Sequence, residues 1–139
     1  MKLVKLPIIE LDGDLLNFAV SACLGVAYEN GALVWRNDGT TKRSLKAPNY
    51  CDSWEVGGPI IQSEGITLSW QPLHQGQEWF ASHPKGVELM AVAHPLVAAM
   101  RCYVESKFGR NFEFPDDLTP RKSKVVNRLK PLFYLLLIF

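Results

Sequence analysis

The sequence predicts an α+β fold, in which two main helices pack on one face of a small antiparallel sheet and a short helical turn lies beside them. Residues 13–24 and 95–108 each have apolar residues at helical spacing, next to residues that commonly begin and end helices. A third segment, VAYENGALVW, places Asn30 and Gly31 between two runs of β-forming residues. The order helix, hairpin, loop, strands, helix and strand is typical of this class.

The first predicted helix covers roughly residues 13–24 and follows Asp12, a residue type that caps helix N-termini. Gly25 tolerates the left-handed conformation in which many helices end. The residues expected on the buried face are Leu15, Phe18, Ala19, Ala22 and Cys23.

The second predicted helix begins at Pro95, because proline is well suited to the first position of a helix, and it ends at Gly109. Its apolar residues form one stripe: Leu96, Ala99, Met100, Tyr103 and Val104. We expect this stripe to face the core.

The Asn30-Gly31 dipeptide predicts a type I′ hairpin turn, because both residue types tolerate a positive φ. Residues 37–53 are rich in turn-forming and polar residues and are predicted to form a long loop. Three basic residues lie close together in that loop: Lys42, Arg43 and Lys46.

The segment WEVGGPIIQSEG is predicted to form a short helical turn, with Pro59 near its first position and Gly65 at its end. Residues 83–86 are predicted to form a turn between antiparallel strands. The expected strands are residues 66–70, 78–82, 87–92 and 111–115.

The chain has 139 residues, of which 47% are apolar and 21% charged, and this composition fits one soluble domain. Five basic residues and no acidic residue fall in residues 119–139, so this tail carries a charge of +5. The other ten basic residues stand against 14 acidic ones, which gives residues 1–118 a charge of −4 and disfavours specific nucleic-acid binding. We expect one α+β domain over residues 1–118 and a separate tail.

The tail is basic first and apolar at its end, where eight apolar residues follow Pro131. A helix that spans a membrane needs roughly 20 apolar residues, so this run is too short to cross a bilayer alone. Apolar spacing from Val125 permits a basic amphipathic helix on a membrane or a partner, although Pro131 opposes it. The alternatives are packing against its own domain or a second copy, and a poorly ordered appendage.

Cysteine usage points to reduced thiols, because Cys23, Cys51 and Cys102 are an odd number and include no C-x-x-C pair. Proline and acidic residues interrupt the first apolar residues before a signal-peptide core can form. We therefore expect a cytoplasmic protein.

Three segments in order resemble one known family: LDGDLLNFAVSACLG, WEVGGPIIQSEGITL and HPLVAAMRCYVESKFGRNFEFP. Over about residues 7–118 the pattern resembles the NinX-like family of small uncharacterised proteins of tailed phages and prophages. The resemblance implies a phage-encoded accessory protein in the host cytoplasm, and it implies no particular reaction. This chain has His94 where the family usually has a hydroxyl residue, and its tail from about residue 119 is an addition.

Hydrolase motifs are absent from the sequence, which contains neither G-x-S-x-G nor H-E-x-x-H. His74, His83 and His94 do not stand at metal-ligand spacing from one another or from the cysteines, so we expect no metal and no cofactor. Catalysis is left open, with a non-catalytic role favoured, because catalytic groups can converge from distant positions.

Arg101 is the first candidate for ligand binding, since it lies at the border of the apolar stripe of the second helix. A guanidinium at such a border either makes a structural contact or binds a phosphate. Tyr50 and Trp54 precede or begin the helical turn and could stack on a base if their loop covers Arg101. The amides of Gly57 and Gly58 could hold an anion, although a tight structural turn also explains them.

The four tryptophans divide into two predicted groups. Trp35 and Trp70 are expected in the sheet core, whereas Trp54 and Trp79 lie near polar or turn segments and are expected to contact a ligand or a protein.

These observations favour a non-catalytic protein that sequesters a nucleotide-like, phosphate-bearing ligand, as part of host takeover or counter-defence. The first alternative is an inhibitor or adaptor that docks on a host or phage enzyme through exposed aromatics and the tail. The second alternative is a small nucleotide hydrolase. Assembly into a homodimer is also left open, because two-fold dimers are the commonest closed oligomers.

Overall fold

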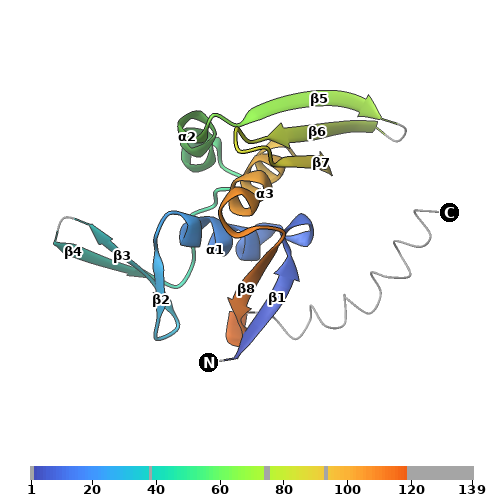
Figure 1. Ribbon diagram of the computed structural model, residues 1–139. Coiled ribbons are helices and arrows are strands. Elements are labelled where there is room, and N and C mark those ends of the chain that lie inside the picture. The colour runs from blue at the N-terminus through green and yellow to red at the C-terminus, as the bar shows by residue number, and fades with distance from the viewer. Residues whose placement is uncertain (1, 38, 74–75, 93, 119–139) are drawn as a thin grey trace. The chain divides into compact units, whose positions relative to one another are not determined.

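The computed structural model describes residues 2–37, 39–73, 76–92 and 94–118 (Figure 1). Two compact units are distinguished, and each is described by itself: Leu6–Phe112 form the larger one, and residues 2–5 and 113–118 belong to the other. The predicted tail, residues 119–139, lies outside the described residues.

The elements confirm the α+β class. The helices are α1 (Gly13–Cys23), α2 (Trp54–Glu64) and α3 (Pro95–Phe108), with 3-10 turns η1 (Ile8–Glu10) and η2 (Asp116–Leu118). The strands are β1 (Leu3–Pro7), β2 (Ala27–Glu29), β3 (Ala32–Asn37), β4 (Thr40–Ser44), β5 (Thr67–Leu73), β6 (Gly76–Ser82), β7 (Glu88–Val92) and β8 (Asn111–Pro115). They form three small sheets, β1-β8, β2-β3-β4 and β5-β6-β7, where one sheet was expected.

The β1-β8 sheet contains the last predicted strand, since β8 covers residues 111–115. In the smaller unit, the Asp116 amide donates a hydrogen bond to the Lys2 carbonyl over 3.0 Å. The strand β1 has no counterpart among the predicted strands.

The helix α3 is the centre of the larger unit, and it contacts α1, α2, β6 and β7. Figure 1 shows it beside α1 and along the β5-β6-β7 sheet. All residues of the predicted apolar stripe are buried: Leu96, Ala99, Met100, Tyr103 and Val104. Pro95 begins the helix and Gly109 follows it with φ +86°, as predicted.

The helix α1 begins and ends as predicted, with Asp12 at the N-cap and Gly25 in a positive-φ conformation after it. The predicted buried face is wrong. The buried residues are Leu16, Asn17, Ala19, Val20 and Ser21, so only Ala19 of the predicted set is fully buried. Apolar spacing could not find this face, because hydrogen bonds let the polar Asn17 lie inside it.

The Asn30-Gly31 hairpin is confirmed: β2 and β3 pair antiparallel, and the two turn residues have φ of 52° and 78°. The long loop predicted for residues 37–53 is wrong in its first part, because β4 pairs antiparallel with β3. Asn37 lies opposite Thr40, and Gly39 between them has φ +79°.

The segment predicted as a short turn is the full helix α2, with Pro59 in its interior instead of near its first position. Gly65 ends the helix in the left-handed conformation, as predicted. Gly57 allows a close approach here, because a Cβ on this residue would meet the Tyr50 carbonyl oxygen and the Leu96 side chain. The predicted Gly57-Gly58-Pro59 turn is therefore replaced by helix interior that packs against the core.

The β5-β6-β7 sheet is antiparallel throughout, and it confirms the strands predicted from residue 66 to residue 92. The turn at residues 83–86 is also confirmed, since the Gly86 amide donates to the His83 carbonyl over 2.9 Å. The His83 ring accepts the Lys85 amide at Nδ1, so its Nε2–H donates to Glu64 Oε1 over 2.9 Å. This pair fastens the end of α2 to the turn.

Trp70 and Trp79 lie directly opposite each other on β5 and β6. Trp70 is 46% exposed, so the prediction that it belongs to the core is wrong. Trp35 is half-buried beside the buried Leu33 and Val34, so it lies at the margin of the core.

Candidate functional site

Arg101 is half-buried on α3, and its Nε donates a hydrogen bond to the Leu11 carbonyl oxygen over 2.6 Å. This bond joins the helix to the segment between η1 and α1. The geometry matches the structural contact that was weighed against phosphate binding for this arginine.

The residues expected to act with Arg101 have different environments. Tyr50 is buried, and burial raises the pKa of its phenol above the ordinary value. Trp54, the first residue of α2, is 54% exposed, as expected. The Gly57 amide donates to the Ser53 carbonyl over 2.9 Å, so a helical hydrogen bond already uses it.

The sequence-predicted ligand residues line neither of two cavities in the larger unit. Those residues are Tyr50, Trp54, Gly57, Gly58, Trp79 and Arg101. Trp79 is half-buried beside Trp70. Joint action of the six on one ligand stays a prediction.

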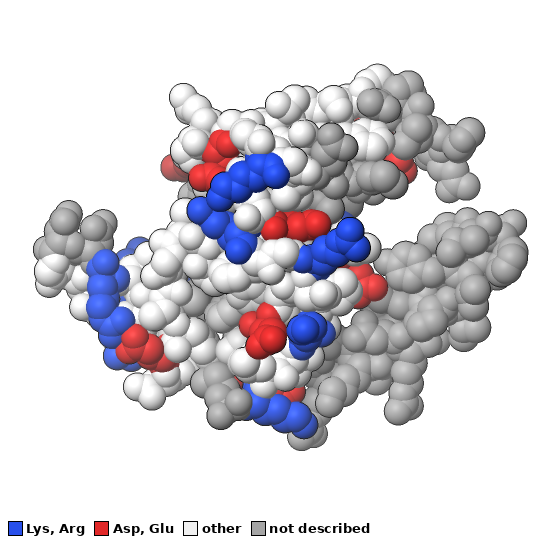
Figure 2. All heavy atoms as spheres, in the orientation of Figure 1, with Lys and Arg blue, Asp and Glu red and all other residues white. Residues whose placement is uncertain are grey.

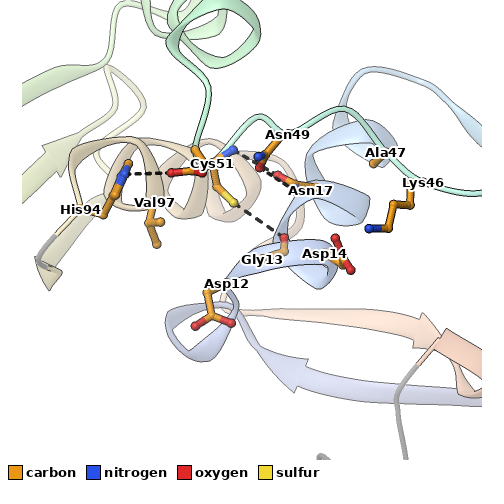
Figure 3. Close-up of a pocket in the computed structure, with 11 residues that line it drawn as sticks. Asp12, Gly13, Asp14, Asn17, Lys46, Ala47, Asn49, Cys51, His94 and Val97 are labelled. Carbon is orange, nitrogen blue, oxygen red and sulfur yellow. Dashed lines mark hydrogen bonds and ion pairs between the residues drawn. The ribbon is translucent and has the colours of Figure 1, made fainter.

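The first cavity has a volume of about 590 Å³, and the start of α1, the segment before α2 and the start of α3 surround it (Figure 3). It is lined by Asp12, Gly13, Asp14, Asn17, Lys46, Ala47, Asn49, Cys51, Asp52, His94 and Val97. Most of these residues are polar, and hence the cavity suits a ligand that makes several hydrogen bonds.

A hydrogen-bond network fixes one wall of this cavity. Asn17 Nδ2 donates to Asn49 Oδ1 over 3.3 Å, and Asn17 Oδ1 accepts the Cys51 amide over 3.1 Å. The Cys51 thiol points to the Gly13 carbonyl, with 3.7 Å between sulfur and oxygen. Burial raises the pKa of the Cys51 thiol, so the thiol is protonated at neutral pH and is a poor nucleophile.

The charges of the first cavity are mostly negative. Asp12, Asp14 and Asp52 supply three carboxylates against the single ammonium of Lys46. His94 Nε2 lies 3.4 Å from Asp52 Oδ1, but both side chains are well exposed, so this contact contributes little to stability.

The second cavity has a volume of about 500 Å³ and lies on the β3-β4 hairpin. It is lined by Trp35, Thr40, Lys42, Ser44, Lys46, Ala47 and Pro48. Trp35 and Lys42 are directly opposite each other in the register of β3 and β4. This cavity therefore combines an indole ring, hydroxyl groups and two ammonium groups, and no carboxylate is among the described residues that line it.

The opposite face of the same hairpin has a different charge arrangement. Arg36 makes two hydrogen bonds to the Glu29 carboxylate, of 2.7 and 2.8 Å, and these bonds hold the pKa of Glu29 below its ordinary value. Figure 2 shows basic side chains gathered over the hairpin with acidic atoms beside them. Lys42 and Lys46 make no ion pair with any residue in the described part of the chain.

The two cavities adjoin, because Lys46 and Ala47 line both of them. The sequence places Lys42 and Lys46 close together, but the loop predicted for residues 37–53 gives no relation between them and Trp35. The Asp-Gly dipeptide at residues 38–39 is a hairpin signal that could have placed Lys42 opposite Trp35.

The segment of the chain that forms both cavities matches a known protein family. A family model described as "Bacteriophage P22, NinX" matches residues 8–107, which include every lining residue of both cavities. The chain belongs to the bacteriophage P22 NinX family. The resemblance drawn from the three sequence segments is thus confirmed, and the NinX family makes this a phage accessory protein. A search of curated proteins gave no match.

Two further properties of the described residues bear on function. Among residues 2–37, 39–73, 76–92 and 94–118, no group of three or more His, Cys, Asp or Glu side chains is arranged to hold a metal ion. No helix in that part of the chain is long and apolar enough to span a bilayer.

Proposed function

We propose that this NinX-family protein is a non-catalytic binding protein that acts in the host cytoplasm, in host takeover or counter-defence, by sequestering a nucleotide-like, phosphate-bearing ligand. The observation that carries the proposal is the cavity in which the Trp35 indole lies opposite Lys42 and close to Lys46. An indole face accepts a stacked base, and ammonium groups bind phosphate.

The backbone geometry supports a defined starting position for the Lys46 side chain at one side of this cavity. The Ser44 hydroxyl donates to the Lys46 carbonyl over 2.7 Å and accepts the Lys46 amide over 3.3 Å. These bonds fix the chain where it leaves β4, so the Lys46 side chain starts from a defined position. Lys42 starts from a position fixed by pairing with β3.

The proposed ligand class is the one expected from the sequence, but different residues would bind it. Trp35 takes the stacking role expected of Tyr50 and Trp54, and the two lysines take the role expected of Arg101. The change follows from the Arg101 bond to Leu11 and the burial of Tyr50.

Calorimetric titration tests the proposal, with nucleoside mono-, di- and triphosphates and inorganic pyrophosphate as ligands. We expect Trp35→Ala and Lys42→Ala each to weaken nucleotide binding about tenfold or more. Arg43→Ala is the matched control, because Arg43 neighbours Lys42 on β4 and does not line the cavity. Equal binding by the wild type and Lys42→Ala would overturn this site.

The same titration separates the other assignments. Loss of binding in a folded Arg101→Ala protein, with Lys42→Ala unaffected, would transfer the site to the residues first predicted from the sequence. Product formation from any nucleotide would favour the hydrolase alternative.

A second candidate function, an inhibitor or adaptor of a host or phage enzyme, is favoured by exposed apolar side chains. Leu45 is 85% exposed and Trp54 more than half exposed, and exposed aromatics are common at protein interfaces. Co-purification of one host enzyme that is lost with Trp54→Ala, and retained with Lys42→Ala, would support this candidate over ligand sequestration.

A further inference from the structure

The strand β4 forms a basic edge of the β2-β3-β4 sheet. Its sequence, TTKRS, contains only hydroxyl and basic side chains, and Lys46 follows shortly after it. No strand in the described part of the chain pairs with the outer edge of β4. Residues 40–48 therefore present three positive charges and no negative charge, although residues 1–118 as a whole carry −4.

The cations of β4 lie on both of its faces, because side chains alternate along a strand. Lys42 lines the cavity with Trp35, whereas Arg43 does not line it and lies on the other face. Arg36 is on that second face too, but its guanidinium is bound to the Glu29 carboxylate over 2.7 and 2.8 Å. Arg43 makes no ion pair with a residue that the structure describes, so its charge is available to a partner.

The cavity next to this site disfavours one direction for a long anion. Beyond Lys46, the described residues that line the adjoining cavity include three carboxylates. These carboxylates repel a polyanion that would continue past Lys46 toward the start of α1. The other direction leads from Trp35 over the unpaired edge of β4 to Arg43, and residues 40–48 place no acidic side chain there.

We infer that the nucleotide held at Trp35 is one unit of a single-stranded nucleic acid, whose backbone crosses β4 from Lys42 to Arg43. The inference rests on the proposed function and extends it from a free nucleotide to a strand. A base inside a duplex cannot stack on a side chain, so the indole selects an unpaired base. Lysine on an edge strand also prevents pairing between sheets, but that role needs no indole opposite the cation. The contact is independent of sequence, because every base has a stacking face.

Fluorescence anisotropy tests this arrangement in the full-length protein. The probe is a labelled, unstructured oligonucleotide of about 12 nucleotides that contains all four bases, a length typical of single-strand binding sites. The comparison ligands are its duplex and the four nucleoside monophosphates. We expect the single strand to bind about tenfold more tightly than either, because it adds phosphate contacts to the same stacked base. The probe is prepared as DNA and as RNA, and the form that binds more tightly identifies the source of the strand.

Two variants separate phosphate contacts from stacking. Arg43→Ala should weaken oligonucleotide binding about threefold or more, and it should reduce the slope of log affinity against log salt by about 0.7, the value for one phosphate contact on a single strand. Nucleotide binding should be unchanged in this variant. Trp35→Ala should weaken oligonucleotide binding about tenfold and keep the slope, because stacking releases no counterions.

Lys85→Ala is the control, since it removes one positive charge from an exposed position in the turn at residues 83–86. It should change neither the oligonucleotide affinity nor the salt slope. A loss equal to that of Arg43→Ala would attribute the effect to overall charge and overturn the inference.

The remaining outcomes distinguish this inference from the proposed function. If Lys42→Ala weakens nucleotide binding but Arg43→Ala leaves oligonucleotide affinity and slope unchanged, the strand is overturned and the proposed function stands. Oligonucleotide binding that survives Trp35→Ala, Lys42→Ala and Arg43→Ala would be assigned to the basic residues 119–139, which overturns the inference. Equal affinity for the duplex overturns the single-stranded class. If neither the oligonucleotide nor any nucleotide binds, both proposals are overturned.

Discussion

The environment of α3 and that of the β3-β4 hairpin differ sharply within the same unit. The apolar stripe of α3 is buried, and the helix contacts two other helices and all three strands of the β5-β6-β7 sheet. On the hairpin, Thr40–Arg43 are all exposed, and the side chains there line a cavity. The difference indicates that stability and the candidate ligand site reside largely in separate regions, so that substitutions can affect one without the other.

Leu96→Ala should have the largest effect on stability. Leu96 is fully buried on α3, so its truncation removes apolar contacts and leaves a cavity, at a cost of about 2–5 kcal/mol in the free energy of unfolding. Leu45→Ala is the matched control, because Leu45 is highly exposed beside the hairpin, and it should change stability by less than about 0.5 kcal/mol. Urea unfolding measures both, and equal losses would contradict the contrast between the regions.

Gly57→Ala should have the next largest effect. Alanine favours a helix over glycine by about 1 kcal/mol. Here, however, the added Cβ would clash with the Tyr50 carbonyl oxygen and would lie 2.9 Å from Leu96 Cδ2. We expect the clash to dominate and to lower stability by about 1–3 kcal/mol.

Gly58→Ala is the control for that clash, because the nearest atom to its added Cβ is 4.0 Å away on Trp54. In this variant the helical preference acts alone and should raise stability by about 0.5–1 kcal/mol. Thermal unfolding of the two variants should therefore give shifts of opposite sign. Shifts of the same sign would show that Gly57 is not closely packed.

Gly31→Ala should have a smaller effect, confined to the hairpin. Gly31 has φ +78° with open space around it, so alanine would meet backbone strain and no clash. The expected cost is about 1–2 kcal/mol. Nucleotide titration of this variant sharpens the comparison, because retained binding would show that the β3-β4 site tolerates strain in the β2-β3 turn.

The sequence was sufficient wherever one local signal decides the structure. Pro95 and Gly109 mark the ends of α3, and the Asn30-Gly31 turn fixes the first hairpin, because these residue types are strongly selected by backbone geometry. It was insufficient where tertiary contacts decide. The spacing of residues in the sequence does not show that Gly57 packs against Tyr50. Local rules would begin the helix at Pro59, whereas the structure has this proline inside α2.

The candidate site was less predictable than the fold, because its residues converge from separate segments. Local rules identified Asp12 as a helix cap but could not place it across a cavity from His94. The pairing of Trp35 with Lys42 was within reach of the sequence, since it depends on a second two-residue hairpin turn. Without that turn, Trp35 and Lys42 were not expected to face each other, and the ligand contacts were predicted at residues such as Arg101 and Tyr50.

Alkaline pH should weaken the α3 region. Burial raises the pKa of the Tyr103 phenol from its ordinary value of 10.0 to about 12, since the charged phenolate is poorly solvated there. The pKa of Tyr103 is higher in the folded state than in the unfolded state. The neutral phenol therefore makes its full contribution to the free energy of unfolding below pH 10, and this contribution is lost as the pH rises toward 12. We expect the urea midpoint to fall less in Tyr103→Phe than in the wild type between pH 8 and pH 11. Partial burial likewise raises the pKa of the half-buried Cys23 thiol, which acts in the same direction, so the variant should remove only part of the fall.

Lys42→Ala should have the smallest effect on stability and a large effect on binding. Its side chain is exposed on β4 and makes no ion pair with a described residue, so the free energy of unfolding should change by less than about 0.5 kcal/mol. Arg43→Ala should be as mild in unfolding but should keep nucleotide affinity, because Arg43 does not line the cavity. Unfolding and titration on the same preparations separate the two properties. If Lys42→Ala destabilised the protein by more than about 1 kcal/mol, the hairpin would contribute to the core in the way that α3 does, and the division between a stable region and a binding region would be wrong.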